Sequence, residues 1–180
     1  FRDNLKRRIE MLNNYEKIGA PFKRGNYEYF YKNSGLQNHS VLYRRPLGSL
    51  QNEEIFIDPN TFSEDGTVAL RGIYFSEDYK TASYMITEGG SDWRKAITIR
   101  VEDKSIVEDT LKNIKFSGIS WKGNDGYFYS DSNGRTAFAG GDFYIQNSVT
   151  NYYNYATNQY IGDSSGDNIY FRGNVLSGTG

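Results

Sequence analysis

One sequence pattern occurs three times along this chain and constrains the fold more than any other feature. Each copy consists of an aromatic residue, a polar turn that contains Gly or Asp, and a strand rich in Tyr or Phe. The first residues of the three copies are Phe22, Phe75 and Trp121, which lie 53 and 46 residues apart. A sequence period of about 40–50 residues is typical of the blades of a β-propeller. The repeat therefore predicts consecutive antiparallel sheets, with these three aromatic residues as structural anchors.

The second copy lies in the best-patterned stretch of the chain, Arg71–Trp93. Two strands are predicted in it, Gly72–Phe75 and Ala82–Thr87, which are separated by a polar turn and followed by a Gly-rich turn. Apolar and polar residues alternate with a period of two, so we expect each strand to bury one face only. Trp93 comes directly after the Gly-rich turn, and we expect it to pack within the blade as a fourth anchor while Asp92 fixes the turn.

The rest of the chain up to residue 130 is predicted to contain one helix and several more strands. The helix covers Phe1–Asn14, because its apolar residues recur at helical spacing. The further strands are Tyr27–Lys32, Ser40–Arg44, Glu53–Ile57 and Lys95–Val101.

A charged connection over Asp103–Asn113, carrying a helical turn, is expected before the last predicted blade. Ile114–Trp121 and Tyr127–Tyr129 are expected to begin that blade. With 16 Tyr, 11 Phe and only three Pro, the composition favours sheet. The predicted fold is mainly all-β: a partial propeller of two to three blades with a short N-terminal helix, followed by a fibre-like or solenoid β-segment.

The composition changes abruptly near residues 131–134. Residues 1–130 hold 37 of the charged side chains, whereas residues 131–180 hold six and are rich in Asn, Gly, Ser, Thr and Tyr. This change predicts three parts: an N-terminal helix at 1–14, propeller blades at 15–130, and an Asn/Gly/Tyr-rich β-segment at 131–180.

Charge and composition argue against several functional classes. The net charge of −1 provides no electrostatic attraction for nucleic acid or an acidic membrane surface, and no apolar run is long enough to span a membrane. The chain has no Cys and therefore no thiol chemistry. The acidic turns Glu64-Asp65 and Asp131–Gly134 lack the ligand spacing of a calcium loop, so we expect no metal and no cofactor.

Two residues are candidates for catalytic groups. Ser164 lies in Gly162–Gly166, which matches the G-x-S-x-G pattern of a hydrolase nucleophile, but the pattern requires a strand before the serine and a helix after it. His39 is the only histidine in the chain, and no cluster of partners surrounds it in the sequence. We therefore expect Ser164 to lie in a turn, His39 to be a satisfied or exposed residue at a strand end, and the chain to have no catalytic residue.

The Tyr-rich strands have two possible roles. Tyr27, Tyr29 and Tyr31 fall on one face of a strand, as do Tyr127 and Tyr129. Such stripes could stack on sugars or bases, but packing between blades is the expected role because the chain has no basic excess.

Several phrases between Phe22 and Ser130 resemble the start of the β-propeller of prolyl oligopeptidases. These phrases are Tyr31–Asn38, Asp58–Asn60, Ser63–Thr67, Phe75–Asp78, Gly90–Trp93 and Lys115–Ile119. The resemblance implies a cytosolic or periplasmic serine peptidase that cuts short peptides after proline. It implies that the propeller is a lid that excludes large substrates, and that the catalytic residues lie on a separate α/β-hydrolase domain. Phe1–Asn14 is similar to the end of the family's N-terminal helical segment, which packs on that domain.

The last part of the chain resembles a different class of protein. Residues 143–180, and Asn168–Asn174 above all, are similar to the shafts of bacteriophage tail fibres, which are trimers. Three functions follow: a non-catalytic fragment or chimera of propeller blades and a fibre-like assembly segment; a piece of a prolyl oligopeptidase; or a virion or surface fibre that binds a receptor or glycan. We expect self-association, as a homotrimer if the fibre resemblance holds, and binding of short peptides only together with a hydrolase domain.

Overall fold

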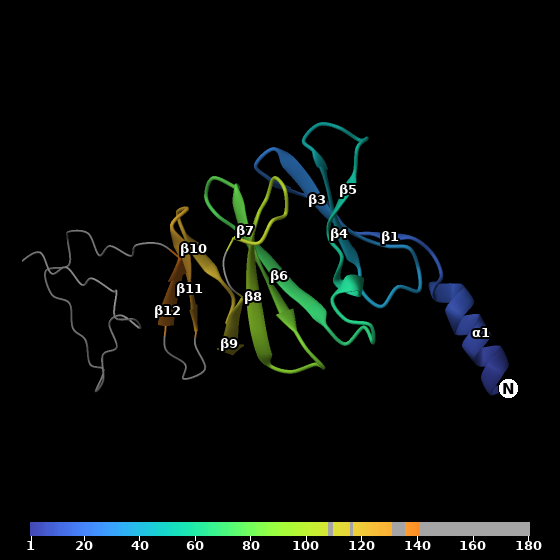
Figure 1. The fold of residues 1–180 in the computed structure, drawn as a ribbon. Coiled ribbons are helices and arrows are strands. Elements are labelled where there is room, and N and C mark those ends of the chain that lie inside the picture. Colours follow the sequence, from blue (N-terminus) through green and yellow to red (C-terminus); the bar gives the residue numbers. More distant parts are fainter. Residues whose placement is uncertain (108–109, 116, 131–135, 141–180) are drawn as a thin grey trace, which may run out of the picture. The chain divides into compact units, whose positions relative to one another are not determined.

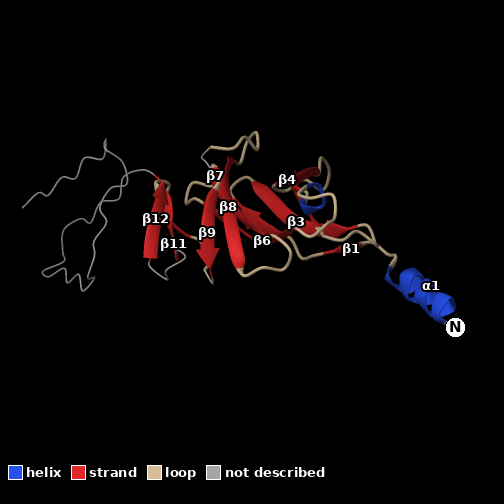
Figure 2. Cartoon of the chain, turned by 60° about the horizontal axis from the view of Figure 1, so that its bottom comes forward, coloured by secondary structure: helices blue, strands red, loops and turns tan. Residues whose placement is uncertain are grey.

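The computed structural model describes residues 1–107, 110–115, 117–130 and 136–140. The chain divides into two compact units, Phe1–Phe143 and Tyr144–Gly180, and all described residues belong to the first. These residues form strands joined by loops, with one α-helix and one short 3-10 helix (Figure 2). Three antiparallel sheets follow one another in chain order, and the second lies between the other two (Figure 1). The predicted mainly-β fold with an N-terminal helix is confirmed for the described residues.

The helix α1 covers Arg2–Asn13, as the sequence predicts to within one residue at each end. Asp3 lies in its first turn, where a negative charge is favourable, and Lys6 forms an exposed ion pair with Glu10. None of its residues is buried, so its apolar side chains are in contact with solvent. None of the helices in the described ranges is long and apolar enough to cross a membrane.

The first sheet contains five strands. They are β1 (Lys17–Ile18), β2 (Phe22–Arg24), β3 (Tyr27–Asn33), β4 (Val41–Pro46) and β5 (Glu54–Ile57). Both β1 and β2 pair with β3, and the sheet continues through β4 to β5. A 3-10 helix at Pro59–Thr61 follows, and Asp58 caps it by accepting a hydrogen bond from Asn60 N.

The second and third sheets are simple meanders. The second contains β6 (Ala69–Phe75), β7 (Thr81–Thr87), β8 (Trp93–Arg100) and β9 (Leu111–Lys115), in that order across the sheet. The third contains β10 (Ser120–Lys122), β11 (Gly126–Ser130) and β12 (Thr136–Gly140). A four-stranded antiparallel meander is the unit of a β-propeller, so the second sheet is a complete blade.

The strand β12 lies beyond the junction predicted near residues 131–134. It pairs with β11 over five positions, from Ser130 opposite Thr136 to Gly126 opposite Gly140. The predicted fibre-like region after residue 140 lies outside the described residues, and the division into three parts remains a prediction.

The strand β9 corrects two expectations from the sequence. Residues 111–113 belong to this strand and not to a charged connection, and the predicted strand Ile114–Trp121 is divided between the second and third sheets. Asn113 has a left-handed backbone (φ 63°), and the register of β9 shifts against β8 between Arg94 and Ala96. Such an irregularity interrupts the period-two pattern by which a strand is recognised.

The second sheet also corrects the expectation that each strand buries one face only. On β7, Ala82 packs in a core shared with the first sheet, whereas Met85 packs in a core shared with the third. Both residues are fully buried, as is Ser83, which lies on the same face as Met85. Buried polar residues cost little when they are hydrogen-bonded, and Ser83 Oγ lies 2.9 Å from Thr98 Oγ1. The polar residues that alternate along β7 therefore face the third sheet and not solvent.

The outer face of the first sheet is partly covered by its own side chains. Phe30 and Val41 lie on this face and are only 4% and 2% exposed. The Arg45 guanidinium lies 5.3 Å from the ring centroid of Phe30, and Lys32 Nζ lies 5.6 Å from that of Tyr43. Long cationic side chains commonly cover apolar surface with their stems while the charge stays in water. Ile18 and Ile55 register on the same face, opposite Lys32 and Tyr43, and are 60% and 45% exposed, so this face keeps uncovered apolar surface beside its covered aromatic residues.

Candidate functional site

The repeated sequence pattern places three hairpin turns in contact with one another. A Cβ at Gly25, in the first turn, would lie 2.9 Å from the Cβ of Tyr79 in the second. Gly25 has a φ of 56°, which other residues adopt only with strain. Two residues of the second turn, Glu77 and Asp78, donate backbone hydrogen bonds to the third turn: to Gly123 O over 3.0 Å and to the side chain of Asn124 over 2.8 Å. The pattern thus predicts contacts between sheets as well as the sheets themselves.

Three of the predicted anchors lie at the contacts between sheets. Phe22 stacks on Tyr29 with centroids 5.6 Å apart, and Tyr29 lies 5.0 Å from Phe75 of the second sheet. Trp121 donates a hydrogen bond from Nε1 to Tyr74 O over 3.1 Å. The aromatic stripes at 27–31 and 127–129 face these contacts as well.

The fourth predicted anchor, Trp93, lies at the start of β8 and is 44% exposed. Lys115 of the neighbouring strand places its Nζ 4.8 Å from the ring centroid. The turn before it is held by Ser91, whose Oγ accepts a hydrogen bond from Trp93 N over 3.1 Å, where the sequence suggested Asp92. Trp93 therefore lies against a lysine at the exposed end of β8, where the sequence suggested packing within the blade.

Arg44 is the residue that the sequence analysis missed. It lies on β4 with a side chain only 3% exposed, and it donates to the Glu54 carboxylate over 2.5 Å. It also donates from Nη1 to Val101 O and from Nη2 to Glu102 O over 3.0 Å. A signal was present, because Leu42 and Arg44 are two residues apart on one strand and so share a face.

Two aromatic rings of the first sheet lie on either side of this contact. The Arg44 guanidinium lies 4.5 Å from the ring centroid of Tyr27 and 4.9 Å from that of Phe56. Such cation–π contacts contribute most where water is excluded. The charge of Arg44 is thus compensated by one carboxylate, two carbonyls and two aromatic faces.

The electrostatics near Arg44 follow from burial and charge. Burial raises the pKa of Tyr29 to about 12, although the positive charge of Arg44 acts in the opposite direction. The Tyr29 hydroxyl is buried, and the nearby Arg44 side chain lowers its pKa as a hydrogen-bond donor would, but no contact in the described part of the chain has full hydrogen-bond geometry. Burial also acts to raise the pKa of Glu54, but hydrogen bonds from Arg44 and Lys104 outweigh it and hold that pKa below its usual value.

The catalytic candidates are not brought together within the described residues. His39 Nε2 lies 2.9 Å from Gly66 O, and the His39 backbone exchanges two hydrogen bonds with the side chain of Asn60. Ser164 lies outside the described residues. Asp65 accepts hydrogen bonds from both N and Oγ1 of Thr67, so its carboxylate closes a turn. No group of three or more His, Cys, Asp or Glu in the described ranges is arranged to hold a metal.

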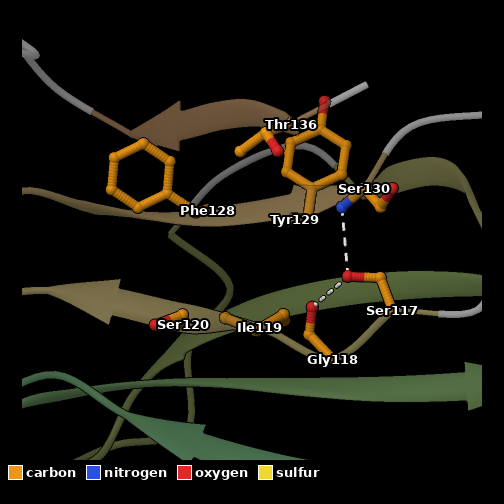
Figure 3. Close-up of a pocket in the computed structure, with 8 residues that line it drawn as sticks. All are labelled: Ser117, Gly118, Ile119, Ser120, Phe128, Tyr129, Ser130 and Thr136. Atoms are coloured by element: carbon orange, nitrogen blue, oxygen red, sulfur yellow. Dashed lines mark hydrogen bonds between the residues drawn. The ribbon is translucent and has the colours of Figure 1, made fainter. Parts of the chain in front are cut away.

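A pocket of about 380 Å³ lies between the segment before β10 and the ends of β11 and β12. Figure 3 shows its lining: Ser117, Gly118, Ile119, Ser120, Phe128, Tyr129, Ser130 and Thr136. Ser117 Oγ accepts a hydrogen bond from Ser130 N and donates one to Gly118 O, over 3.0 and 2.7 Å. No His, Cys, Asp, Glu, Lys or Arg is among these eight described residues.

Comparison with known proteins gives one consistent result. Residues 1–142 match the family model of the prolyl oligopeptidase N-terminal β-propeller domain. The prolyl endopeptidase of Elizabethkingia meningoseptica is 51% identical over 130 residues, covering 72% of this chain and 18% of that protein. Prolyl oligopeptidase A of Galerina marginata is 33% identical over 147 residues, covering 69% of this chain and 20% of that protein.

Solved structures agree with the sequence comparison. A chain from a structural study of two prolyl endopeptidases matches with a TM-score of 0.61 and 37% identity, over 72% of this chain and 19% of that one. Prolyl oligopeptidase B of Galerina marginata, bound to a 25mer macrocyclization substrate, matches with a TM-score of 0.64 and 26% identity, over 71% of this chain and 21% of that one.

The chain spans about a fifth of the length of these relatives. The family match ends at residue 142, so the tail-fibre resemblance of the last part remains a prediction. This chain belongs to the prolyl oligopeptidase family and carries part of its N-terminal β-propeller domain.

Proposed function

We propose that this chain is a non-catalytic part of a prolyl endopeptidase and forms the first blades of the propeller that restricts access to its active site. The observation that carries the proposal is the stack of sheets in which the second buries both faces, together with the family match over residues 1–142. Packed sheets of this kind form a rigid scaffold, which suits a role in restricting access and not in catalysis. The hydrolysis itself would belong to a peptidase domain outside this sequence.

The proposed substrates of the whole enzyme are short peptides that are cut after proline. This class is taken from the relatives, which carry the names prolyl endopeptidase and prolyl oligopeptidase. A propeller excludes large substrates by shape, so it needs neither a charged patch nor a reactive group.

The helix α1 supports the proposal that the chain belongs to a longer protein. Its Leu5, Ile9 and Leu12 side chains are 49%, 50% and 57% exposed although they recur at helical spacing. An amphipathic helix in water is stabilised mainly by packing of its apolar face, so α1 requires a partner surface. We propose the peptidase domain of the same enzyme as that surface.

A domain exchange tests the lid function. The matching 130-residue segment of the Elizabethkingia meningoseptica enzyme would be replaced by the corresponding residues of this chain. We expect the hybrid to cleave a short chromogenic Gly-Pro substrate and to leave a folded protein substrate intact. A folded hybrid that lacks activity, or one that degrades the folded protein, would contradict the proposal.

Two glycine variants of the hybrid supply a matched control. A Cβ at Gly126 would lie within 2.9 Å of Gly140 Cα and still closer to Ala139 O, so Gly126→Ala is expected to disrupt the third sheet and weaken exclusion. A Cβ at Gly19 would lie no nearer than 3.6 Å to its neighbours, so Gly19→Ala is expected to behave as the parent hybrid.

The isolated chain should not turn over the same substrate. Activity that copurifies with the chain and is abolished by Ser164→Ala would show that this serine is a nucleophile. That result would overturn the proposal of a non-catalytic chain.

A further inference from the structure

Arg44 connects the first sheet to the segment between β8 and β9 of the second sheet. Its backbone lies on β4, but two of its guanidinium nitrogens donate to Val101 O and Glu102 O, which come directly after β8. These acceptors lie 57 and 58 residues further along the chain. Because a planar guanidinium presents its donors in a fixed fork, two successive carbonyls define both its position and its angle.

A second cation connects the same two sheets in the opposite direction. Lys104 lies after β8 and donates from Nζ to Glu54 Oε2 over 3.1 Å and to Ile55 O over 2.7 Å. Glu54 on β5 therefore accepts from Arg44 of its own sheet and from Lys104 of the other. Ile55 O belongs to the last strand of the first sheet, so Lys104 also occupies an acceptor at the sheet edge.

We propose that these groups form an interblade lock that holds the first sheet in one position on the second, so that the two sheets move as a single rigid unit. This interblade lock consists of Arg44, Glu54, Lys104 and the carbonyls of Val101 and Glu102. It is a conformational device within the propeller, and its test does not depend on whether the parent enzyme is a peptidase.

The hydrogen bonds of the lock fix the position of one sheet on the other more than they add to the free energy of unfolding. The surrounding core of aromatic and aliphatic side chains would tolerate small shifts of one sheet over the other, because apolar contacts are not directional. Hydrogen bonds from a charged donor are directional, and a buried charge that loses them is strongly disfavoured. Sliding of the first sheet would break all Arg44 contacts to the second at once.

Hydrogen exchange of the 180-residue chain tests this proposal. In Arg44→Met, which keeps the apolar stem, amides of β3 and β4 should exchange about tenfold faster or more, while amides of β7 and β8 stay within about twofold. Arg44→Lys should behave similarly, because an ammonium lacks the fork that spans both carbonyls.

Arg45→Met is the matched control. Arg45 is the next residue on the same strand and is largely buried at 19% side-chain exposure, but it pairs with Glu28 of its own sheet over 2.9 Å. We expect no difference in the ratio of exchange between the first and second sheets. Lys104→Met removes a different member of the lock, at a side chain that is 33% exposed, and should raise exchange in β5.

Three results would overturn the proposal. One is unchanged exchange in Arg44→Met, and another is an equal increase in both sheets, which would mean a general loss of stability. The third is parent-like exchange in Arg44→Lys, which would show that charge alone is sufficient.

Discussion

At the scale of single residues, the least usual group in the described structure is the Tyr29 hydroxyl. It is buried without a hydrogen-bond partner in the described ranges, while the ring packs against Phe22, Phe56 and Phe75. An unsatisfied buried hydroxyl costs about 1–3 kcal/mol relative to a matching apolar group. Tyr29 therefore contributes mainly through its ring, because its oxygen has at best a poorly aligned donor in Arg44.

The variant Tyr29→Phe is expected to increase the free energy of unfolding by about 1 kcal/mol, because it removes the unsatisfied oxygen and keeps the ring. Chemical denaturation followed by circular dichroism measures this change. A decrease of similar size would mean that the hydroxyl is satisfied in solution, for example by a bound water.

Tyr29 also predicts a loss of stability in alkali. Its pKa in the folded protein is raised to about 12, so the folded state holds the proton more tightly than the unfolded state, whose value is near 10. The stabilisation is complete below pH 10 and is lost as pH rises towards 12. Tyr29→Phe should lack this component when denaturation midpoints are compared at about pH 9 and about pH 11.

Glu54 predicts the opposite dependence in acid. Its pKa is lowered in the folded state, so its contribution is present above the usual value of 4.5 and is lost as pH falls through the lower folded value. Glu54→Gln should remove this part of the acid sensitivity. A variant with the same acid denaturation profile as the parent would show that Glu54 is not coupled to folding.

At the scale of elements, the three hairpin turns that contact one another, at Gly25, Tyr79 and Gly123, connect the sheets. Glycine substitutions test this connection. Gly25 and Gly89 have the same φ of 56°, but only a Cβ at Gly25 would meet a neighbour, at Tyr79, whereas Gly89 faces open space. Both Gly→Ala variants incur the backbone cost of roughly 1 kcal/mol. Gly25→Ala should lose more than Gly89→Ala in denaturant unfolding, and equal losses would show that the turns do not support one another.

The sequence predicted strand positions well where side chains alternate without interruption. The strand at Ala82–Thr87 is correct within one residue, but its polar positions were assigned to solvent because Ser83 and Thr98 satisfy each other only in the folded sheet. β9 was missed because the bulge at Asn113 breaks the period.

The residues of the candidate site also divide into those that a pattern in the sequence reveals and those that it does not. Phe22, Phe75 and Trp121 were found because their spacing repeats along the chain. Arg44 was missed because charge normally indicates surface, and its acceptors are carbonyls 57 and 58 residues away that no local pattern reveals.

At the scale of the whole molecule, the open question is how the chain associates. We propose self-association, and a trimer if residues 131–180 form a fibre-like segment. On the outer face of the first sheet, Arg45 and Lys32 cover the aromatic residues, so the exposed Ile18 and Ile55 are its apolar contact points. Light scattering at micromolar concentration measures the mass, and a monomer would contradict the proposal.

Arg45→Ala provides a matched test of that surface. The change removes the side chain above Phe30 and leaves Glu28 without this ion pair, so it should expose apolar surface and increase association. Lys23→Ala, at an exposed strand position, serves as the control and should leave the mass unchanged. Equal masses for all three proteins would show that the cover over Phe30 does not govern association.

The two faces of the first sheet have a consequence for synthesis on the ribosome. This sheet precedes the second in the chain, and Arg45 and Lys32 lie over the aromatic residues of its outer face without help from a later sheet. Its other face, with Tyr29 and Leu42, packs against the second sheet, which emerges next. The nascent first sheet therefore exposes this large apolar face only until the second sheet has emerged.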